Sequence, residues 1–123
     1  MGQKAKVGSP TRGDVILVDF DPTVGAEIRK RRPAVVIQNE IDNRHSPITI
    51  VAALSSRVDD EIFPTEVAVA PPEGGLSKPS VVLLNQLRSV DRCRLIARLG
   101  RLRPETMTRV DQALRISLGL IDL

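Results

Sequence analysis

The 123-residue chain is long enough for one domain, and its 41% hydrophobic content supports one core, although Tyr and Trp are absent. A formal net charge of +3 and an isoelectric point near 9.6 are compatible with a polyanionic partner such as nucleic acid. A single histidine, His45, and a single cysteine, Cys93, exclude a His-Glu-x-x-His zinc site, a two-histidine acid–base pair and an internal disulfide within one chain.

The beginning of the chain differs in composition from the rest. Residues 1–11 are polar, contain glycine, proline and serine, and show no period, which predicts a flexible arm ahead of a single domain at residues 12–123. No apolar stretch of about 18 residues and no signal-peptide pattern is present. We therefore expect a soluble, cytoplasmic protein without a membrane span.

Short segments rich in Val and Ile follow one another at regular spacing. Such segments are typical of β-strands, and turn-rich pieces separate them. The predicted strands are residues 14–20, 33–38, 48–55, 65–70, 80–84 and 94–102, and the predicted turns are residues 21–32, 39–47, 57–64 and 71–79. Because no long helix interrupts the strands, we expect a mainly antiparallel sheet, bent into a small barrel.

The period changes near the end of the chain. Met107, Val110, Leu114, Leu118 and Ile121 recur at spacings of three and four, which predicts one apolar stripe on a helix. A proline and a glutamate just before this stripe suit the first helical turn. The predicted fold is therefore mainly β, with a C-terminal helix packed against the barrel.

The first candidate for chemistry is the loop at residues 21–32, which ends against a proline. It carries Glu27 and a basic run that includes Arg31 and Arg32. A guanidinium matches phosphate oxygens in a two-pronged fork, and a carboxylate can take part in acid–base chemistry. On spacing alone, solvated loop charges with Glu27 paired to an arginine explain the same pattern.

Two further polar pairs follow apolar runs. Ser55 and Ser56 stand where the run ITIVAAL stops, and their hydroxyls could bond a phosphate or cap a turn. Asn85 and Gln86 follow the run SVVLL, where amide side chains could read base edges or close a loop. Neither pair is specific in isolation.

Taken together and in order, these segments resemble the MazF/PemK family of toxins. The resemblance rests on RGDVILVDFDPTVGAE, RRPAVVIQNE, NRHSPITIVAALSS, PTEVAVA and SVVLLNQLRSVDRCRL, followed by the terminal helix. It runs from about residue 12 to the C-terminus. Its most specific parts are the Gly-Asp-strand-Asp-Pro-x-x-Gly-x-Glu pattern ahead of Arg-Pro, and Gln-Leu-Arg-Ser-Val-Asp near the end.

The resemblance implies an SH3-like barrel of the MazF/CcdB type that dimerises and cleaves single-stranded RNA without a metal or cofactor, within a short preferred sequence. Attack by the 2′-hydroxyl would leave a 2′,3′-cyclic phosphate and a 5′-hydroxyl. By position, the catalytic residues would be Arg32, Ser55 and Glu27. The residues expected to bind RNA are Asn39, Gln86, Ser56 and Arg31.

The same resemblance implies a partner and leaves two alternatives. The partner would be a MazE-like antitoxin of a type II toxin–antitoxin system, whose acidic, partly disordered tail competes with RNA. One alternative is a non-catalytic toxin on the same fold that binds a topoisomerase. The other is a barrel that binds nucleic acid without cutting it.

Overall fold

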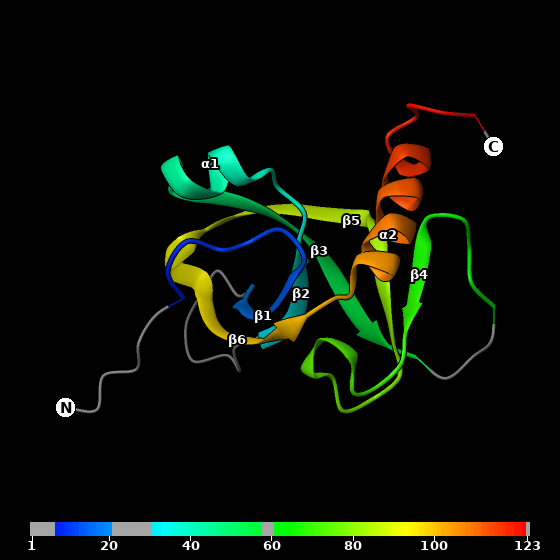
Figure 1. The fold of residues 1–123 in the computed structure, drawn as a ribbon, viewed down its shortest axis with the longest axis horizontal. Coiled ribbons are helices and arrows are strands. Elements are labelled where there is room, and N and C mark those ends of the chain that lie inside the picture. The colour runs from blue at the N-terminus through cyan, green and yellow to red at the C-terminus, as the bar shows by residue number, and fades with distance from the viewer. Residues whose placement is uncertain (1–6, 21–30, 58–60, 123) are drawn as a thin grey trace.

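The structure is a computed structural model that describes residues 7–20, 31–57 and 61–122. The strands in these residues are β1 (Asp14–Asp19), β2 (Arg31–Val36), β3 (Ile48–Ser56), β4 (Glu66–Val69), β5 (Ser80–Asp91) and β6 (Leu95–Arg101). The helices are α1 (Glu40–His45) and α2 (Pro104–Ser117), with two short 3-10 turns, η1 (Glu73–Gly75) and η2 (Arg92–Arg94) (Figure 1).

The strands form one sheet in the order β4-β5-β3-β2-β1-β6, and every pair of neighbours is antiparallel. This confirms the predicted mainly β fold with a C-terminal helix. Within the described residues no pairing joins β4 to β6, so the sheet is bent but open. The turn η1 lies against β6 so closely that a Cβ on Gly100 would sit 2.5 Å from the Gly74 carbonyl carbon, which requires glycine there.

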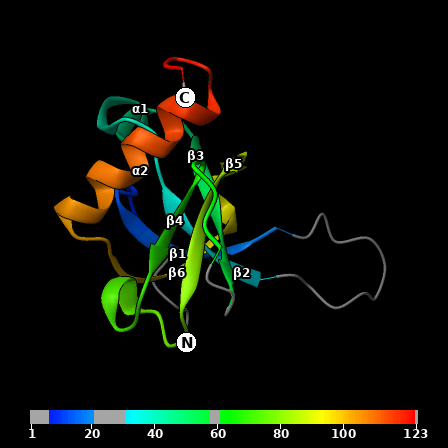
Figure 2. The same ribbon diagram turned by 90° about the vertical axis from the view of Figure 1, so that its right-hand side faces the viewer.

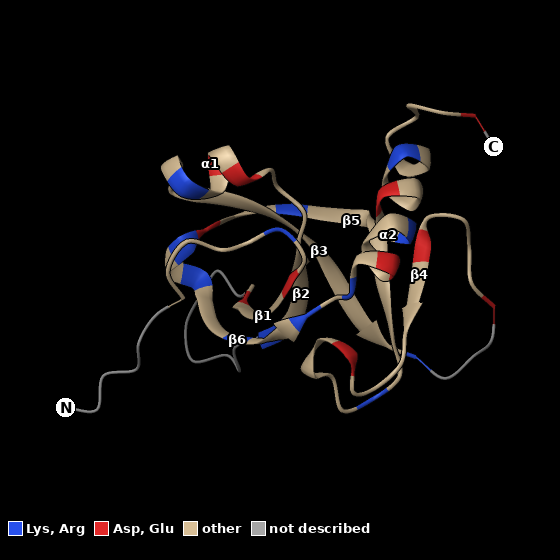
Figure 3. Ribbon diagram, viewed as in Figure 1, with Lys and Arg blue, Asp and Glu red and all other residues tan. Residues whose placement is uncertain are grey.

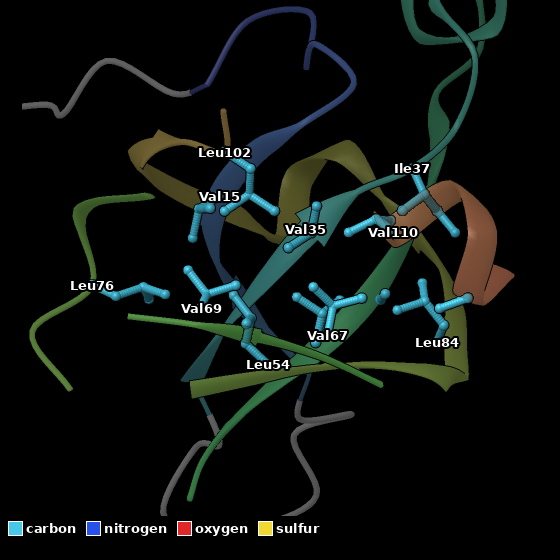
Figure 4. Packing of buried hydrophobic residues seen from close by; sticks show 13 residues of the cluster. Val15, Val35, Ile37, Leu54, Val67, Val69, Leu76, Leu84, Leu102 and Val110 are labelled. Carbon is cyan, nitrogen blue, oxygen red and sulfur yellow. The ribbon is translucent and has the colours of Figure 1, made fainter. Parts of the chain in front are cut away.

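Residues on the inner strands alternate between two buried clusters. On β1, Val15 belongs to one cluster and Ile16 to the other, and on β2 the same holds for Val35 and Val36. Successive strand side chains point to opposite faces, so β1 and β2 are covered on both sides. Figure 4 shows the larger cluster, in which Val110 of α2 packs against side chains of the sheet.

The C-terminal helix is shorter than its sequence pattern predicts. Helix α2 ends at Ser117, and Gly119 adopts a positive φ of 72°. The Leu120 amide then donates to the Arg115 carbonyl at 2.8 Å, which closes the helix end in the manner of a glycine cap. The prediction that Leu118 and Ile121 continue the buried stripe is therefore wrong, since both are exposed.

Two elements differ from the sequence-based expectation. Strand β5 continues to Asp91, because a bulge between the pairs Ala53↔Leu83 and Ala52↔Leu87 bends the strand without ending it. The predicted turn at residues 39–47 contains α1. Asn39 caps this helix by accepting a hydrogen bond from the Asp42 amide at 2.9 Å.

The amino-terminal segment also contacts the fold. Among residues 7–11, expected in the arm, Val7 packs against a buried cluster and Pro10 is buried. The Thr11 amide donates to the carboxylate of Asp14 at 2.9 Å. Within the described part of the chain, none of the helices is both long and apolar enough to cross a lipid bilayer.

Candidate functional site

A hollow of about 420 Å³ opens at one end of the central strands. The start of β2 and the end of β3 form one side, and the segment between η1 and β5 forms the other. Leu54 and Leu76, both members of the larger core cluster, line its apolar part (Figure 4). The remaining lining residues are Arg32, Pro33, Ser55, Ser56, Ser77, Lys78 and Ser80.

The sheet register explains why Arg32 and Ser55 share this hollow. Strands β2 and β3 pair through Ala34↔Ala53 and Val35↔Ala52. Extending this register by two residues beyond Ala34↔Ala53 places Arg32 opposite Ser55. Directly opposite residues in an antiparallel pair project their side chains to the same face. The two predicted catalytic residues that the structure describes thus lie on the same side, just beyond the last pair of this register, and both line the hollow.

The hydroxyls of the hollow differ in their bonding. Ser80 Oγ is buried and donates to the Lys78 carbonyl at 2.9 Å, so it stabilises the turn into β5. Ser55 Oγ lies 3.5 Å from the Ser56 carbonyl, at the outer limit of a hydrogen bond. A donor held this weakly can turn towards a ligand, and the phosphate contact expected of Ser55 stays a prediction.

Lys78 is a second cation in the hollow that sequence reasoning missed. Its segment is fixed by the buried Leu76 on one side and by the Arg57 amide, which donates to the Pro79 carbonyl at 3.2 Å, on the other. The sequence alone placed Lys78 in a turn-rich stretch far from Arg32. A lysine beside a proline at the start of a strand was the available signal, but nothing local connects it to β2.

Several other predicted site residues lie elsewhere. Arg31 neighbours Arg32 on β2, so its side chain projects to the opposite face, and it does not line the hollow. Asn39 lies beyond the other end of β2 and caps α1, and Gln86 is exposed in the bulge of β5. Their contacts with RNA stay predictions. Glu27 lies outside the described residues.

The hollow is suited to a small polyanionic group. Two cations, Arg32 and Lys78, and several hydroxyls line it, and none of its described lining residues is acidic. Guanidinium and ammonium groups beside hydroxyl donors are the groups that bind phosphate oxygens. Among the described residues, no group of three or more His, Cys, Asp and Glu side chains is arranged to hold a metal ion.

Comparison with known proteins identifies the family. Residues 11–118 match the model of the PemK-like, MazF-like toxins of type II toxin–antitoxin systems. The chain belongs to this family. The match spans every described strand and the whole of α2, and it includes both walls of the hollow.

Individual relatives agree with this membership. Endoribonuclease EndoA of Bacillus subtilis (strain 168) is 45% identical over 111 residues, which cover 90% of this chain and 96% of the relative. An endoribonuclease solved with its cognate antitoxin, from mycobacterial species, superposes with a TM-score of 0.76 at 26% identity and covers 93% of this chain and 99% of that one. A MazE–MazF structure from Deinococcus radiodurans has the same TM-score at 29% identity, covering 92% and 98%.

Proposed function

We propose that this toxin is an endoribonuclease that cleaves single-stranded RNA within a short preferred sequence and needs no metal ion. The observation that carries the proposal is the hollow in which Arg32, Ser55 and Lys78 meet. The names of the relatives support the same activity, since EndoA and the mycobacterial proteins are endoribonucleases.

The proposed reaction is an internal transfer followed by release. The 2′-oxygen attacks the adjacent phosphorus and loses its proton, while the bond from phosphorus to the 5′-oxygen breaks. The leaving 5′-oxygen takes up a proton, so the products are a 2′,3′-cyclic phosphate and a 5′-hydroxyl. The role of Arg32 is to stabilise the charge that develops on the phosphoryl oxygens, because a guanidinium is a strong hydrogen-bond donor and a poor base.

Ser55 and Lys78 complete the proposed phosphate site. Ser55 Oγ donates to a phosphoryl oxygen and is not a nucleophile, since the 2′-hydroxyl supplies the attacking atom. Lys78 adds charge but lacks the planar fork of an arginine, so its role is attraction and positioning. Glu27 remains the candidate for accepting the 2′-proton.

The proposal also covers assembly and control. The toxin acts as a cytoplasmic homodimer, and an acidic, partly disordered antitoxin segment competes with RNA for its groove. The structures of relatives with a cognate antitoxin and with MazE support a partner of this kind.

The test is cleavage of a long unstructured RNA in excess EDTA, followed by mapping of the new 5′ ends. We expect cuts at one repeated short motif, and a loss of about 100- to 1000-fold in rate for Arg32→Ala. Arg44→Ala, an exposed arginine on α1, is the matched control and retains the wild-type rate. Intact RNA with folded, dimeric wild-type protein would refute the proposal and favour the non-catalytic toxin.

A further inference from the structure

One arginine of β5 lies over an aromatic ring at the end of β1. The guanidinium carbon of Arg88 is 4.9 Å from the centroid of the Phe20 ring. Arg88 is exposed, and Phe20 is half-buried against the smaller core cluster, which contains Ile16 and Val36. Arg88 belongs to the Gln-Leu-Arg-Ser-Val-Asp segment of β5, and the proposed reaction does not use it.

Other arginines in this part of the chain are held by oxygen atoms of the fold. Figure 3 shows basic positions on β5 and in the turn η2 that follows it. Arg94 of this turn donates to the Asp19 carbonyl at 3.2 Å, and Arg98 donates to Asp14 at 2.9 Å. Among the residues that the structure describes, the ring of Phe20 is the one partner of the Arg88 guanidinium. The face of this guanidinium that is turned away from the ring is therefore available to a ligand.

The sheet register sets Arg88 and Phe20 on the same face as Arg32. Val18 pairs with Arg32 across β1 and β2. Val51 pairs with Arg88 across β3 and β5. Both valines belong to the smaller cluster, and directly opposite residues share a face. Phe20 directly follows β1 and is two residues beyond Val18, so it is a diagonal neighbour of Arg32, at a distance of about 7–8 Å. Figure 2 shows the end of β1 beside the start of β2, and the ring therefore adjoins the proposed phosphate site.

A guanidinium that lies over a ring offers a flat surface on which a base can stack. Aromatic rings and arginine planes are the groups that hold the unstacked bases of single-stranded RNA. The chain contains two phenylalanines and neither tyrosine nor tryptophan. Phe63, the other ring, precedes β4, which β5 and β3 separate from β2 in the sheet. Phe20 with Arg88 is thus the aromatic site next to Arg32.

We infer that the exposed face of the Arg88 guanidinium stacks one base of the RNA substrate next to the scissile phosphate. The inference rests on the proposed ribonuclease function and adds a residue that selects a base. Phe20 touches no base and is a positioning residue, because its ring holds the guanidinium in place. A purine presents more ring area to the guanidinium than a pyrimidine does, so this position favours adenine or guanine.

The probe for the test is a fluorescein-labelled 2′-O-methyl octanucleotide that carries the motif mapped in the cleavage assay. The methyl group blocks the attacking hydroxyl, so binding is measured apart from cleavage. Further probes each lack the base at one position, and a last pair carries a purine or a pyrimidine next to the scissile phosphate. The Kd of each probe is measured by anisotropy, and circular dichroism confirms that each protein variant is folded.

We expect loss of one base next to the scissile phosphate to raise the Kd of the wild type about tenfold, and the purine probe to bind more tightly than the pyrimidine probe. Arg88→Lys keeps the charge but loses the plane. It should weaken the intact probe about tenfold, with less than about twofold further loss when that base is absent. Phe20→Leu keeps apolar bulk without a ring and should weaken the intact probe about threefold. Arg115→Lys, at an exposed arginine of α2, is the matched control and should leave every Kd unchanged.

Three results would overturn the inference while leaving the ribonuclease function intact. Wild-type affinity in Arg88→Lys would show that the charge of Arg88 binds a phosphate. A loss in Arg88→Lys that adds fully to the loss from each missing base would show that Arg88 stacks none of them. Tighter binding of the pyrimidine probe would contradict the expected base preference. By contrast, a wild type that neither cuts RNA nor binds any probe would overturn the proposed function and the inference together.

Discussion

Arg57 and Glu66 form a two-point ion pair across the base of the loop between β3 and β4. Arg57 Nη2 donates to Glu66 Oε1 at 2.6 Å, and Nη1 donates to Oε2 at 3.2 Å. Glu66 also accepts a hydrogen bond from the Phe63 amide at 3.0 Å, and its side chain is only 7% exposed. Since Arg57 directly follows Ser55 and Ser56, this pair fixes the strand end that carries the candidate hydroxyls.

We expect Glu66→Gln to lower the free energy of unfolding by about 1–3 kcal/mol, because a charge-assisted, largely buried hydrogen bond becomes a weaker neutral one. Urea unfolding followed by circular dichroism measures this change. Glu61→Gln, in the same loop but exposed, should change the free energy by less than about 0.5 kcal/mol. Equal effects of the two substitutions would show that the ion pair adds nothing to stability.

The same pair makes stability depend on pH. Hydrogen bonds from Arg57 hold the pKa of Glu66 below its ordinary value of 4.5, although burial acts in the opposite direction. Because the folded carboxyl binds its proton less tightly than the unfolded one, its contribution is complete above pH 4.5 and is lost as the pH falls through the lower folded-state pKa. Urea titrations from neutral pH to about pH 3 should show the gap between wild type and Glu66→Gln closing. A gap independent of pH would contradict this account.

Two substitutions at Ser55 distinguish the effect of its hydroxyl on the cleavage rate from the effect of its side-chain size. Ser55→Ala removes one hydrogen bond to a charged phosphate, which is worth about 1.5–3 kcal/mol, and should lower kcat by about 10- to 100-fold. Ser55→Thr keeps the hydroxyl and should stay within about threefold of wild type, since the added methyl only restricts rotation about χ1. Single-turnover cleavage of a fluorescent oligonucleotide measures both. Equal rates for Ala and Thr would remove Ser55 from the phosphate site.

Lys78→Met tests the cation that sequence reasoning missed. If Lys78 neutralises one RNA phosphate, its loss should reduce the slope of log affinity against log salt concentration by about 0.7. Affinity for a non-cleavable oligonucleotide with 2′-O-methyl groups should fall uniformly across sequences. The control is Arg44→Met, also an exposed cation, which should leave the slope unchanged. An unchanged slope for Lys78→Met would exclude a phosphate contact.

A buried amide cluster beside α1 provides a test of the fold alone. Asn43 is 1% exposed, and its Oδ1 accepts hydrogen bonds from Gln38 Nε2 at 3.0 Å and from Thr49 Oγ1 at 2.8 Å. Asn43→Ala removes the acceptor of Thr49 Oγ1 and one of the two acceptors of Gln38 Nε2, which keeps its bond to the Ile48 carbonyl at 2.9 Å. We therefore expect a loss of about 2–4 kcal/mol in thermal or urea unfolding. Asn85→Ala, at an exposed amide, should be nearly neutral. A neutral Asn43→Ala would mean that water replaces the lost acceptor.

The amino-acid sequence by itself determined the class of fold and the approximate places of its strands. Alternating Val and Ile residues predict strands because one strand face must be buried, and that requirement is local. The helix was foreseen for the same reason, from the stripe that contains Val110. The sequence also contains a signal for the start of α1, because Asn39 followed three residues later by Asp42 is a helix-capping pattern. The surrounding residues favour a turn, and the sequence therefore predicts a turn there.

Only the tertiary structure decided which polar residues meet. Arg32 and Ser55 share a hollow because of the register of β2 and β3, and Lys78 joins them because Leu76 is buried in the core. Arg31 and Arg32 are neighbours on β2, so their side chains project to opposite faces of the strand. Their charges alone do not distinguish the two arginines. Register and the burial of distant side chains are long-range properties, so neither composition nor local spacing reports them.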